Sequence, residues 1–305
     1  MSIKGFKGTK VVPKSVFAEL PQTYPLSKEQ LRFYDANGYL VLKELIDFAS
    51  LYAFKHRFAQ ICNGLTKDYY AQIIKDSVLM AKTQKPEEYV NKLQDILYDD
   101  VFSQYSENPR LLHVVSQLLG DDITGMHSMF INKPPGTDRH PPHQDMYYFP
   151  FRPADKIVGT WTAVDHVSLD NGCLYVVPGS HKANILYPHV NQLISIVLYH
   201  GILDEETVAP EERRVHLEMS PGDTVFLHPM LVHGSGPNIT TNYRKAISVH
   251  YAASSCEYVD VSGTVQEMAA KEVEEIARKK GFNNIKFQDV WKLKSKQVKG
   301  VRSNL

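Results

Sequence analysis

Length, composition and charge place the chain among ordinary globular proteins. It has 305 residues, a length that is ample for a buried core. Hydrophobic residues make up 43% and charged residues 22%, which are ordinary values for a globular protein. Lysine plus arginine and aspartate plus glutamate are equal at 34 each, so no net charge draws the protein to nucleic acid or to an anionic membrane.

Cysteine usage and hydropathy narrow the class further. Cys62, Cys173 and Cys256 show no paired or metal-like spacing, which favours a reducing compartment over a disulfide-bonded secreted protein. No apolar run is long enough to span a membrane, and the basic N-terminus lacks the apolar segment of a secretory signal. We therefore expect no membrane span and no nucleic-acid partner, while the oligomeric state stays open.

The N-terminal part of the chain is predicted to be helical. Residues 1–25 are expected to form an irregular arm. A helix then runs from Ser27 to about Ala36, because Ser27 and Gln30 form a capping box and Asn37-Gly38 ends the helix. Residues 39–42 predict a short strand, and helical periodicity dominates from Phe48 to Leu118.

From about residue 120 to 262 the sequence has a β texture. Short β-branched and aromatic runs alternate with turn residues, and they predict strands at 123–132, 143–149, 157–166, 173–177, 213–219, 224–227 and 245–253. Residues 182–212 are a long insertion with helical character at Val190–Tyr199. A second capping box, Thr264 and Glu267, begins a final helix that Gly281 ends. We expect one mainly β domain over residues 26–305, a sandwich or barrel with flanking helices.

A His-x-Asp pair supplies the first candidate metal ligands. In an extended strand, residues two apart point to the same face, so His143 and Asp145 can reach one point. A third ligand must come from elsewhere, and a second β segment, residues 225–234, supplies the histidines His228 and His233. Two imidazoles and one carboxylate on one octahedral face leave three positions open, which suits Fe(II) that must bind a co-substrate and O₂. The alternatives are a histidine hydrogen-bonded to backbone and a capping aspartate.

Arg244 extends this metal site. It lies eleven residues after His233, at the start of a predicted strand that can pair beside the strand carrying His233. An arginine there can form a bidentate pair with a carboxylate. 2-Oxoglutarate requires two adjacent metal positions for its 1-carboxylate and 2-keto oxygens and a cation further in for its 5-carboxylate. Arg244 therefore indicates a 2-oxoglutarate site, and a surface salt bridge is its alternative role.

Five segments of the sequence resemble the phytanoyl-CoA dioxygenase (phytanoyl-CoA 2-hydroxylase) family. They are MHSMFINKPP at 126–135, RHPPHQDMYYFPFRP at 139–153, NGCLYVVPGSHK at 171–182, DTVFLHPMLVHGSG at 223–236 and YRKAIS at 243–248. The resemblance implies a double-stranded β-helix (jelly-roll, cupin-like) core, with Fe(II) and 2-oxoglutarate as cofactor and co-substrate. It also implies hydroxylation of a fatty acyl-CoA at C2 with O₂, release of succinate and CO₂, and ascorbate as the reductant.

The resemblance assigns two groups of site residues, position by position. The implied iron ligands are His143, Asp145 and His233. The residues implied to hold 2-oxoglutarate, besides these metal ligands, are Lys92, Met129, Trp161, Ser235 and Arg244. Trp161 and Met129 have plain core packing as their alternative, and Lys92 has a solvated helix face. His140, His181 and His228 lie near the site in sequence and are expected to support it rather than to bind the metal.

Two loops depart from the family pattern, so the specificity for the acyl chain stays open. The loop at 136–138 looks short, and residues 182–212 differ in length and sequence. One alternative function is an oxygenase of the same family that acts on a small molecule without CoA. Others are an inactive binding protein and a zinc hydrolase, since histidine and aspartate also bind zinc.

The last three residues bear on location. Ser303-Asn304-Leu305 resembles the Ser-Lys-Leu peroxisomal address with its basic residue replaced. This tail and the family resemblance favour the peroxisome, with an import receptor as a possible partner, and the cytoplasm is the alternative.

Overall fold

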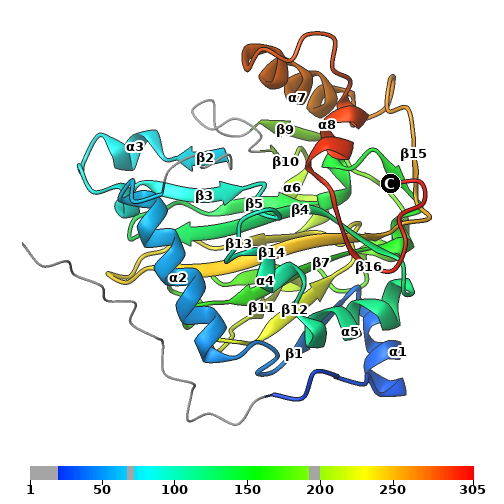
Figure 1. The fold of residues 1–305 in the computed structure, drawn as a ribbon, viewed down its shortest axis with the longest axis horizontal. Helices are drawn as coiled ribbons and strands as arrows, with labels where there is room; N and C mark the ends of the chain where they lie inside the picture. Colours follow the sequence, from blue (N-terminus) through cyan, green and yellow to red (C-terminus); the bar gives the residue numbers. More distant parts are fainter. Residues whose placement is uncertain (1–19, 67–71, 192–199) are drawn as a thin grey trace, which may run out of the picture.

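Two antiparallel β-sheets that face each other form the centre of the molecule (Figure 1). The computed structural model describes residues 20–66, 72–191 and 200–305. The large sheet has the strand order β1 (Tyr39–Leu42), β12 (Thr224–Leu227), β7 (Ile157–Ala163), β14 (Arg244–Ala253), β4 (Ile123–Lys133), β3 (Val90–Gln94) and β2 (Gln72–Lys75), and β16 (Lys296–Lys299) also pairs with β4. The small sheet has the order β11 (Val215–Leu217), β8 (Leu174–Val176), β13 (His233–Ser235) and β5 (His140–His143).

Smaller elements surround the two sheets. Two further strand pairs are β9 (His189–Asn191) with β10 (His200–Ile202), and β6 (Phe151–Arg152) with β15 (Glu257–Tyr258). The α-helices are α1 (Lys28–Asn37), α2 (Phe48–Cys62), α3 (Ser77–Met80), α4 (Ser103–Ser106), α5 (Pro109–Leu119), α6 (Glu205–Val208), α7 (Glu267–Lys279) and α8 (Phe287–Lys294). The 3₁₀ turns are η1 (Pro86–Glu88), η2 (Asp145–Tyr148), η3 (Ala154–Lys156), η4 (Ser180–Ala183) and η5 (Glu211–Arg213).

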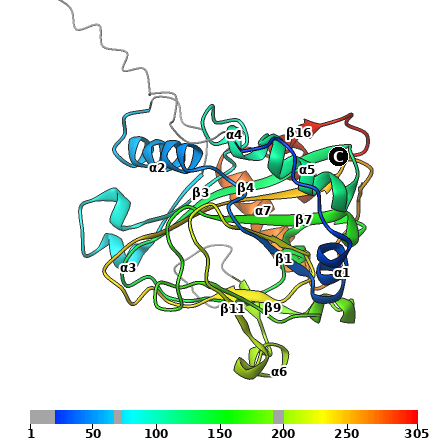
Figure 2. The same cartoon turned by 90° about the horizontal axis from the view of Figure 1, so that it is seen from below.

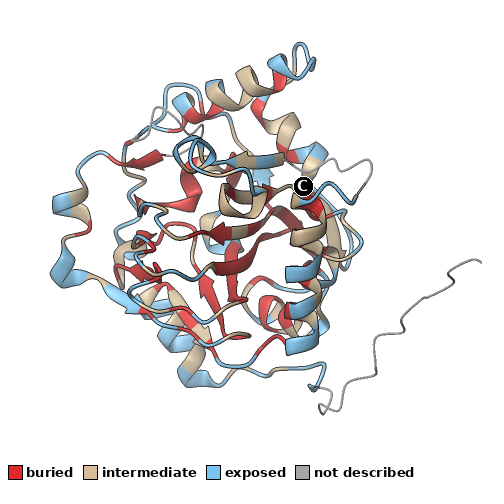
Figure 3. Cartoon of the chain, turned by 90° about the vertical axis from the view of Figure 1, so that its left-hand side faces the viewer, coloured by how far each residue is buried: buried red, intermediate tan, exposed pale blue. Residues whose placement is uncertain are grey.

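The large sheet is covered on both faces. Figure 2 shows α2, α4 and α5 on one side of it and the small sheet, with β11, on the other. The spacing of Leu51, Phe54, Phe58 and Ile61 puts one apolar stripe of α2 against the sheet, where these four residues are buried. In Figure 3 the strands are mainly buried, while the exposed residues lie on the outer elements.

Strand β14 connects the two halves of the core. All ten of its residues are buried, as expected for a central strand covered on both faces. Ile247, Val249 and Tyr251 belong to the cluster under the helices. The intervening positions Arg244, Ser248 and His250 line the space toward the small sheet. Side chains alternate across a strand, so one strand supplies both the core and a polar pocket wall.

The first predicted helix is confirmed in detail. Ser27 and Gln30 form the capping box of α1, and Gly38 ends the helix in the left-handed conformation with φ of 79°. Residues 1–19 of the predicted arm lie outside the described residues. Within residues 20–25, the backbone N–H of Tyr24 donates to Nδ1 of His113 on α5 at 3.1 Å.

Helical periodicity was misleading between α2 and α5. Residues 72–75 and 90–94 are the strands β2 and β3, which extend the edge of the large sheet. In β3 the two buried residues are Val90 and Leu93. Their spacing of three residues imitates a helix turn in the sequence, and only the pairing with β4 reveals the strand.

Three other predictions of local structure were wrong. A strand was predicted at 143–149, but the observed strand β5 ends at His143 and the next residues, Asp145–Tyr148, form the 3₁₀ turn η2. Residues 190–191 of the predicted helical stretch belong to β9, and residues 192–199 lie outside the described residues. The second capping box is absent: Thr264 donates to the carbonyl of Val261, and Gln266 is the N-cap of α7. The side chain of Gln266 instead donates to backbone carbonyls of η2, so a tertiary contact decides this helix start.

In the described part of the chain, no helix combines the length and the apolar character needed to cross a bilayer.

The packing of α2 yields a test of the core. Phe58 is fully buried, and its ring stacks on Phe130 of β4 with 4.9 Å between centroids. We expect Phe58→Ala to lower the free energy of unfolding by about 3–5 kcal/mol, because it leaves a cavity. Phe48→Ala on the same helix is the control, since Phe48 is 60% exposed, and it should change stability by less than about 0.5 kcal/mol. Equal effects in chemical denaturation would contradict the packing of α2 on β4.

Candidate metal and 2-oxoglutarate site

Three ligand side chains converge where the small sheet meets η2. His143 ends β5, His233 begins β13, and the two are paired across these strands. Asp145 opens η2, and Gln144 before it keeps an extended backbone. One ligand atom from each of His143, Asp145 and His233 lies within 4.8 Å of the other two, and all three residues are buried. The structure therefore brings the predicted triad together in an arrangement that fits one metal ion.

Backbone carbonyls determine which imidazole nitrogen faces the carboxylate. Nδ1 of His143 donates to the carbonyl of Pro141, and Nδ1 of His233 donates to the carbonyl of Leu231, both at 3.0 Å. Nε2 of each ring lies 3.7 Å from Oδ1 of Asp145. A metal-binding histidine usually donates its other ring N–H in this way, which fixes the tautomer. The backbone hydrogen bonds thus leave Nε2 of both rings available to a metal ion.

The charges of the triad favour a cation. Burial, with His233 nearby, lowers the pKa of His143 to about 3, so this ring is neutral and can act as a ligand. Burial by itself raises the pKa of the Asp145 carboxyl, but His250, His233 and His143 outweigh it and hold this pKa well below its usual range. Asp145 is therefore an ionised carboxylate, as a metal ligand must be.

His250 holds the second oxygen of Asp145. Its Nε2 donates to Oδ2 of Asp145 at 2.9 Å, and both side chains are buried. Because Oδ2 is occupied, Oδ1 is the oxygen that faces His143 and His233. His250 lies on β14 of the large sheet and Asp145 follows β5 of the small sheet, so this bond also joins the two sheets at the site.

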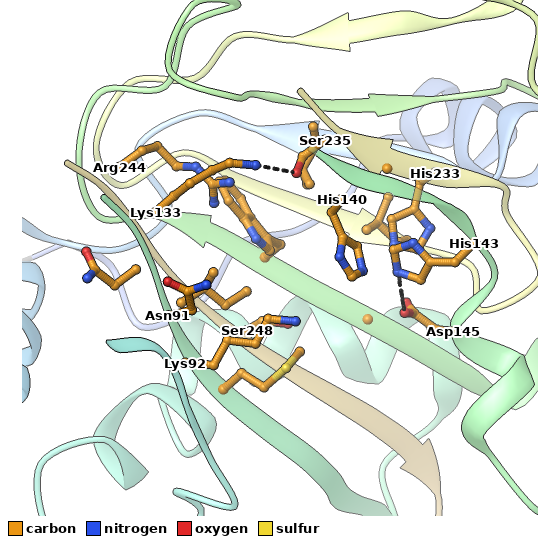
Figure 4. A pocket seen from close by; sticks show the side chains of 18 of the residues that line it. Asn91, Lys92, Lys133, His140, His143, Asp145, His233, Ser235, Arg244 and Ser248 are labelled. Atoms are coloured by element: carbon orange, nitrogen blue, oxygen red, sulfur yellow. Dashed lines mark hydrogen bonds and ion pairs between the residues drawn. The ribbon is translucent and has the colours of Figure 1, made fainter. Parts of the chain in front are cut away.

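A cavity of about 140 Å³ between the sheets connects the triad with three cationic side chains (Figure 4). Arg244 begins β14, Lys133 ends β4 and Lys92 lies on β3. Nζ of Lys133 donates to Oγ of Ser235 at 3.2 Å and to the carbonyl of Gly236. Figure 4 shows Arg244 and Lys133 at one end of the pocket and His143, Asp145 and His233 at the other.

The cationic end is short of negative charge. Burial lowers the pKa of Arg244 to about 10, and burial with Arg244 nearby lowers the pKa of Lys92 to about 8. Burial also lowers the pKa of Lys133 well below its usual value. Among the described residues, Nε of Arg244 has no hydrogen-bond partner. Buried positive charge is costly unless a counter-charge is bound, so this end of the cavity suits an anion such as a carboxylate.

Every residue implied by the resemblance lines this cavity. They are Lys92, Met129, His143, Asp145, Trp161, His233, Ser235 and Arg244. The guanidinium of Arg244 lies over the ring of Trp161, 5.3 Å from its centroid, so Trp161 contributes to the pocket wall as well as to the core. The individual roles of these residues remain predictions.

Two expectations about these residues were wrong. Lys92 lies on the strand β3 and not on a solvated helix face. The strand of Arg244 does not pair with that of His233: β14 pairs with β4 and β7, whereas β13 pairs with β5 and β8. Arg244 is 2% exposed, which excludes the surface salt bridge. It reaches the metal site from the facing sheet rather than from a neighbouring strand.

Sequence reasoning missed Lys133 and His250. Both follow from the period of two: Lys133 lies four residues after Met129 on β4, and His250 lies six residues after Arg244 on β14. His140 also lines the cavity, with its ring 4.4 Å from that of His143.

His181 and His228, in contrast, lie away from the cavity. Their rings are 5.0 Å apart, and His181 contacts the backbone carbonyl of Asp35 on α1.

Comparison with known proteins gives the family. The family model described as phytanoyl-CoA dioxygenase (PhyH) matches residues 34–246. The chain belongs to this family. "Phytanoyl-CoA dioxygenase, peroxisomal" from Bos taurus is 44% identical, over 92% of this chain and 85% of the relative. "Probable phytanoyl-CoA dioxygenase" from Caenorhabditis elegans is 43% identical, over 92% of this chain and 95% of the relative. The family and the dioxygenase class predicted from the sequence are confirmed.

Solved structures show the same fold at low sequence identity. EctD from S. alaskensis in its apoform has a TM-score of 0.63 at 20% identity, over 82% of this chain and 85% of that chain. The carbocyclase SnoK from nogalamycin biosynthesis has a TM-score of 0.58 at 21% identity, over 77% of this chain and 87% of that chain. The predicted double-stranded β-helix fold is confirmed.

The bond from His250 to Asp145 can be tested through metal affinity. We expect His250→Phe to weaken binding of Fe(II) about 10- to 100-fold, because Asp145 loses the donor that orients its carboxylate. His127→Phe is the matched control, since the His127 ring stacks on His250 with 5.9 Å between centroids and its Nδ1 lies 3.6 Å from the carboxylate of Asp95 rather than beside Asp145. Anaerobic competition with a colorimetric chelator measures both affinities, and an unchanged affinity for His250→Phe would remove this role.

Proposed function

We propose that this protein is an Fe(II)- and 2-oxoglutarate-dependent dioxygenase that hydroxylates C2 of a fatty acyl-CoA, with release of succinate and CO₂. The observation that supports it is the two-ended cavity, with His143, Asp145 and His233 at one end and a cationic cluster at the other. A dicarboxylate with a keto group beside one carboxylate matches both ends at once. The donor set of the triad fits Fe(II), because a face of two histidines and one carboxylate leaves three positions open.

A bound Fe(II) would supply the O₂ chemistry that couples decarboxylation of 2-oxoglutarate to hydroxylation of the substrate. His143, Asp145 and His233 would hold the ion from one side and leave its other side to the co-substrate and O₂. Arg244 would pair with the far carboxylate, and its planar guanidinium suits a bidentate bond. Ser235 would donate its hydroxyl to the same carboxylate, and Lys92 would add positive charge.

Other residues of the cavity keep this arrangement in place. Lys133 positions Ser235 and Gly236 through its ammonium group. Gly172 makes this possible: a Cβ there would lie 2.6 Å from the carbonyl oxygen of Gly236 and 3.0 Å from the side chain of Lys133. Trp161 and Met129 form the apolar part of the wall and exclude water from the reacting atoms.

The acyl-CoA substrate is proposed from the names of relatives and not from the metal site alone. The relatives from Bos taurus and Homo sapiens are named for phytanoyl-CoA. A same-family oxygenase acting on a molecule without CoA is the second candidate, and competition between CoA thioesters and free acids in a decarboxylation assay separates the two. A zinc hydrolase leaves Arg244 and Lys133 without a role, and an inactive binding protein leaves the complete triad without one.

The names of the same relatives bear on location. The relatives named above as peroxisomal support the peroxisome for this protein. We also propose ascorbate as the reductant that keeps the iron in the Fe(II) state. In the structure Leu305 is buried, and the N–H of Asn304 donates to the carbonyl of Ser254 at 2.9 Å. An import receptor that reads Ser303-Asn304-Leu305 would therefore have to detach this tail first.

The role of Asp145 has a direct test. We expect Asp145→Ala to abolish O₂-dependent formation of succinate, because the variant lacks one metal ligand and leaves His250 without its partner. Asp170→Ala, in an exposed turn, is the control and should keep full activity. Succinate is measured by mass spectrometry with Fe(II), 2-oxoglutarate and ascorbate. Undiminished succinate from Asp145→Ala would refute the ligand assignment.

The charge of Lys92 predicts how binding of 2-oxoglutarate depends on pH. The pKa of Lys92 is lowered to about 8, so its ammonium group is charged below this pH and neutral above it. Binding of a dianion raises this pKa, so the Kd for 2-oxoglutarate should rise as the pH increases through about 8, by up to about tenfold per pH unit.

A variant isolates this contribution. Lys92→Met should bind 2-oxoglutarate more weakly below about pH 8 and should lose the pH dependence. Lys75→Met is the control on the neighbouring strand β2, because Lys75 is exposed. Anaerobic calorimetry on the Fe(II)-loaded protein gives Kd and proton uptake. A steep pH dependence that persists in Lys92→Met would assign the titration to another group.

A further inference from the structure

A second cavity begins at the metal site and ends at the C-terminal helices. It has a volume of about 460 Å³, within the ~300–1,000 Å³ that small-molecule sites occupy. Its wall near the triad is polar and includes Lys92, Gln94 and His140. Its far wall is mainly apolar, with Ile276, Ala277, Phe282, Val290 and Leu293 beside the two lysines Lys280 and Lys294. The cavity thus changes from polar to apolar along its length, starting where the reacting atoms would lie.

The far wall belongs to one hairpin, formed by α7, the loop 280–286 and α8, which stands above the sheets in Figure 1. On α8, Phe287 and Trp291 are buried in the core, while Val290 and Leu293 line the cavity. On α7, Val273, Ile276 and Ala277 lie at the i, i+3 and i+4 positions of one helix face. The hairpin therefore has apolar surface beyond the part that fixes it to the core.

Two polar contacts hold the hairpin in position. Nε2 of His200 on β10 lies 3.0 Å from a carboxylate oxygen of Glu272 on α7. Nζ of Lys294 on α8 lies 3.4 Å from a carboxylate oxygen of Asp95, just after β3. These contacts fix both helices to the β core, so the cavity wall is formed before any ligand binds.

Apolar groups at the hairpin remain uncovered. Leu293 is 65% exposed and Phe282 is 54% exposed, and both line the cavity. Exposed apolar side chains gathered around a cavity indicate a site that an apolar ligand covers. Nucleotide phosphates would need cations instead, and of the two lysines among the lining residues of the hairpin, Lys294 is already paired with Asp95.

We propose that the hairpin α7–α8 binds the hydrocarbon chain of the substrate, with the thioester end of the chain toward the triad and its tail along Ile276, Ala277 and Leu293. This assignment rests on the proposed function, because it takes the substrate to be a long-chain acyl thioester. It gives the hairpin control over chain length. The matched family region ends at residue 246, so this hairpin lies beyond it.

Binding to metal-free protein tests the proposal without catalysis. The probes are octyl-, dodecyl- and hexadecyl-CoA thioethers, which are not hydrolysed, together with the free fatty acids of the same lengths. We expect the affinity to rise up to about fourfold for each added methylene until the cavity is filled, which corresponds to burial of one CH₂ group. Calorimetry measures each Kd.

Two variants with matched controls locate the chain. Ala277→Phe fills the cavity and should remove the higher affinity of the longer chains. Met268→Phe on the same helix should leave that affinity unchanged, since Met268 does not line the cavity. Leu293→Asn should weaken the affinity about tenfold for the hexadecyl probe only, because the variant removes apolar area where the end of this chain would lie. Because Leu293 is 65% exposed, this variant should fold, and Leu203→Asn, at 64% exposed, is its control.

The outcomes separate the two proposals. An unchanged gain per methylene in Ala277→Phe and Leu293→Asn overturns the chain site. If the affinity of the free acids rises with chain length while no CoA thioether binds, the result supports the chain site and overturns the CoA substrate. Turnover of acyl-CoA with no dependence on chain length supports the proposed function and overturns the chain site.

Discussion

The pairing of β5 with β13 is the contact on which the site depends. It sets His143 directly opposite His233, although the two are far apart in the chain. The carbonyls two residues before each histidine then orient both rings, and the turn η2 returns Asp145 to the same point. A shift of this register by one residue would turn one imidazole to the opposite face of the sheet. Metal binding therefore depends on strand register as directly as it depends on the three side chains.

The second constraint is charge. The cavity between the sheets buries Arg244 and Lys133, beside the partly buried Lys92, while Asp145 is engaged by His250 and the histidines. Such an arrangement destabilises the free protein, since burial lowers the pKa of each cation. A bound metal ion and a bound dicarboxylate compensate the two ends separately: the ion neutralises the carboxylate end and the dianion neutralises the cationic end. The energetic cost of burying these cations is thus the source of the selectivity of the cavity for a charged co-substrate.

The sequence predicted the residues of the site better than it predicted their arrangement. His143, Asp145, His233 and Arg244 could be found because their spacing and the family resemblance do not depend on knowing the fold. The strand β3 could not be predicted from the sequence, because Val90 and Leu93 repeat at a helical spacing. Only the pairing with β4 decides the conformation of this segment. Arg244 was expected beside the strand of His233, but sequence order does not reveal which of two facing sheets a strand joins.

The same reasoning explains where specificity can vary. The chemistry of the site is built on strands that are buried on both faces, so a substitution in β14 affects the pocket on one side and the core on the other. Part of the cavity face of the hairpin α7–α8 is free of this double constraint, because Leu293 and Phe282 line the cavity and are 65% and 54% exposed. Substitutions on that face can change the volume available to a ligand while the register of β5 and β13 stays intact. A fold of this kind separates metal and co-substrate binding, which need fixed strands, from the proposed selection of the acyl chain, which needs only an adjustable apolar wall.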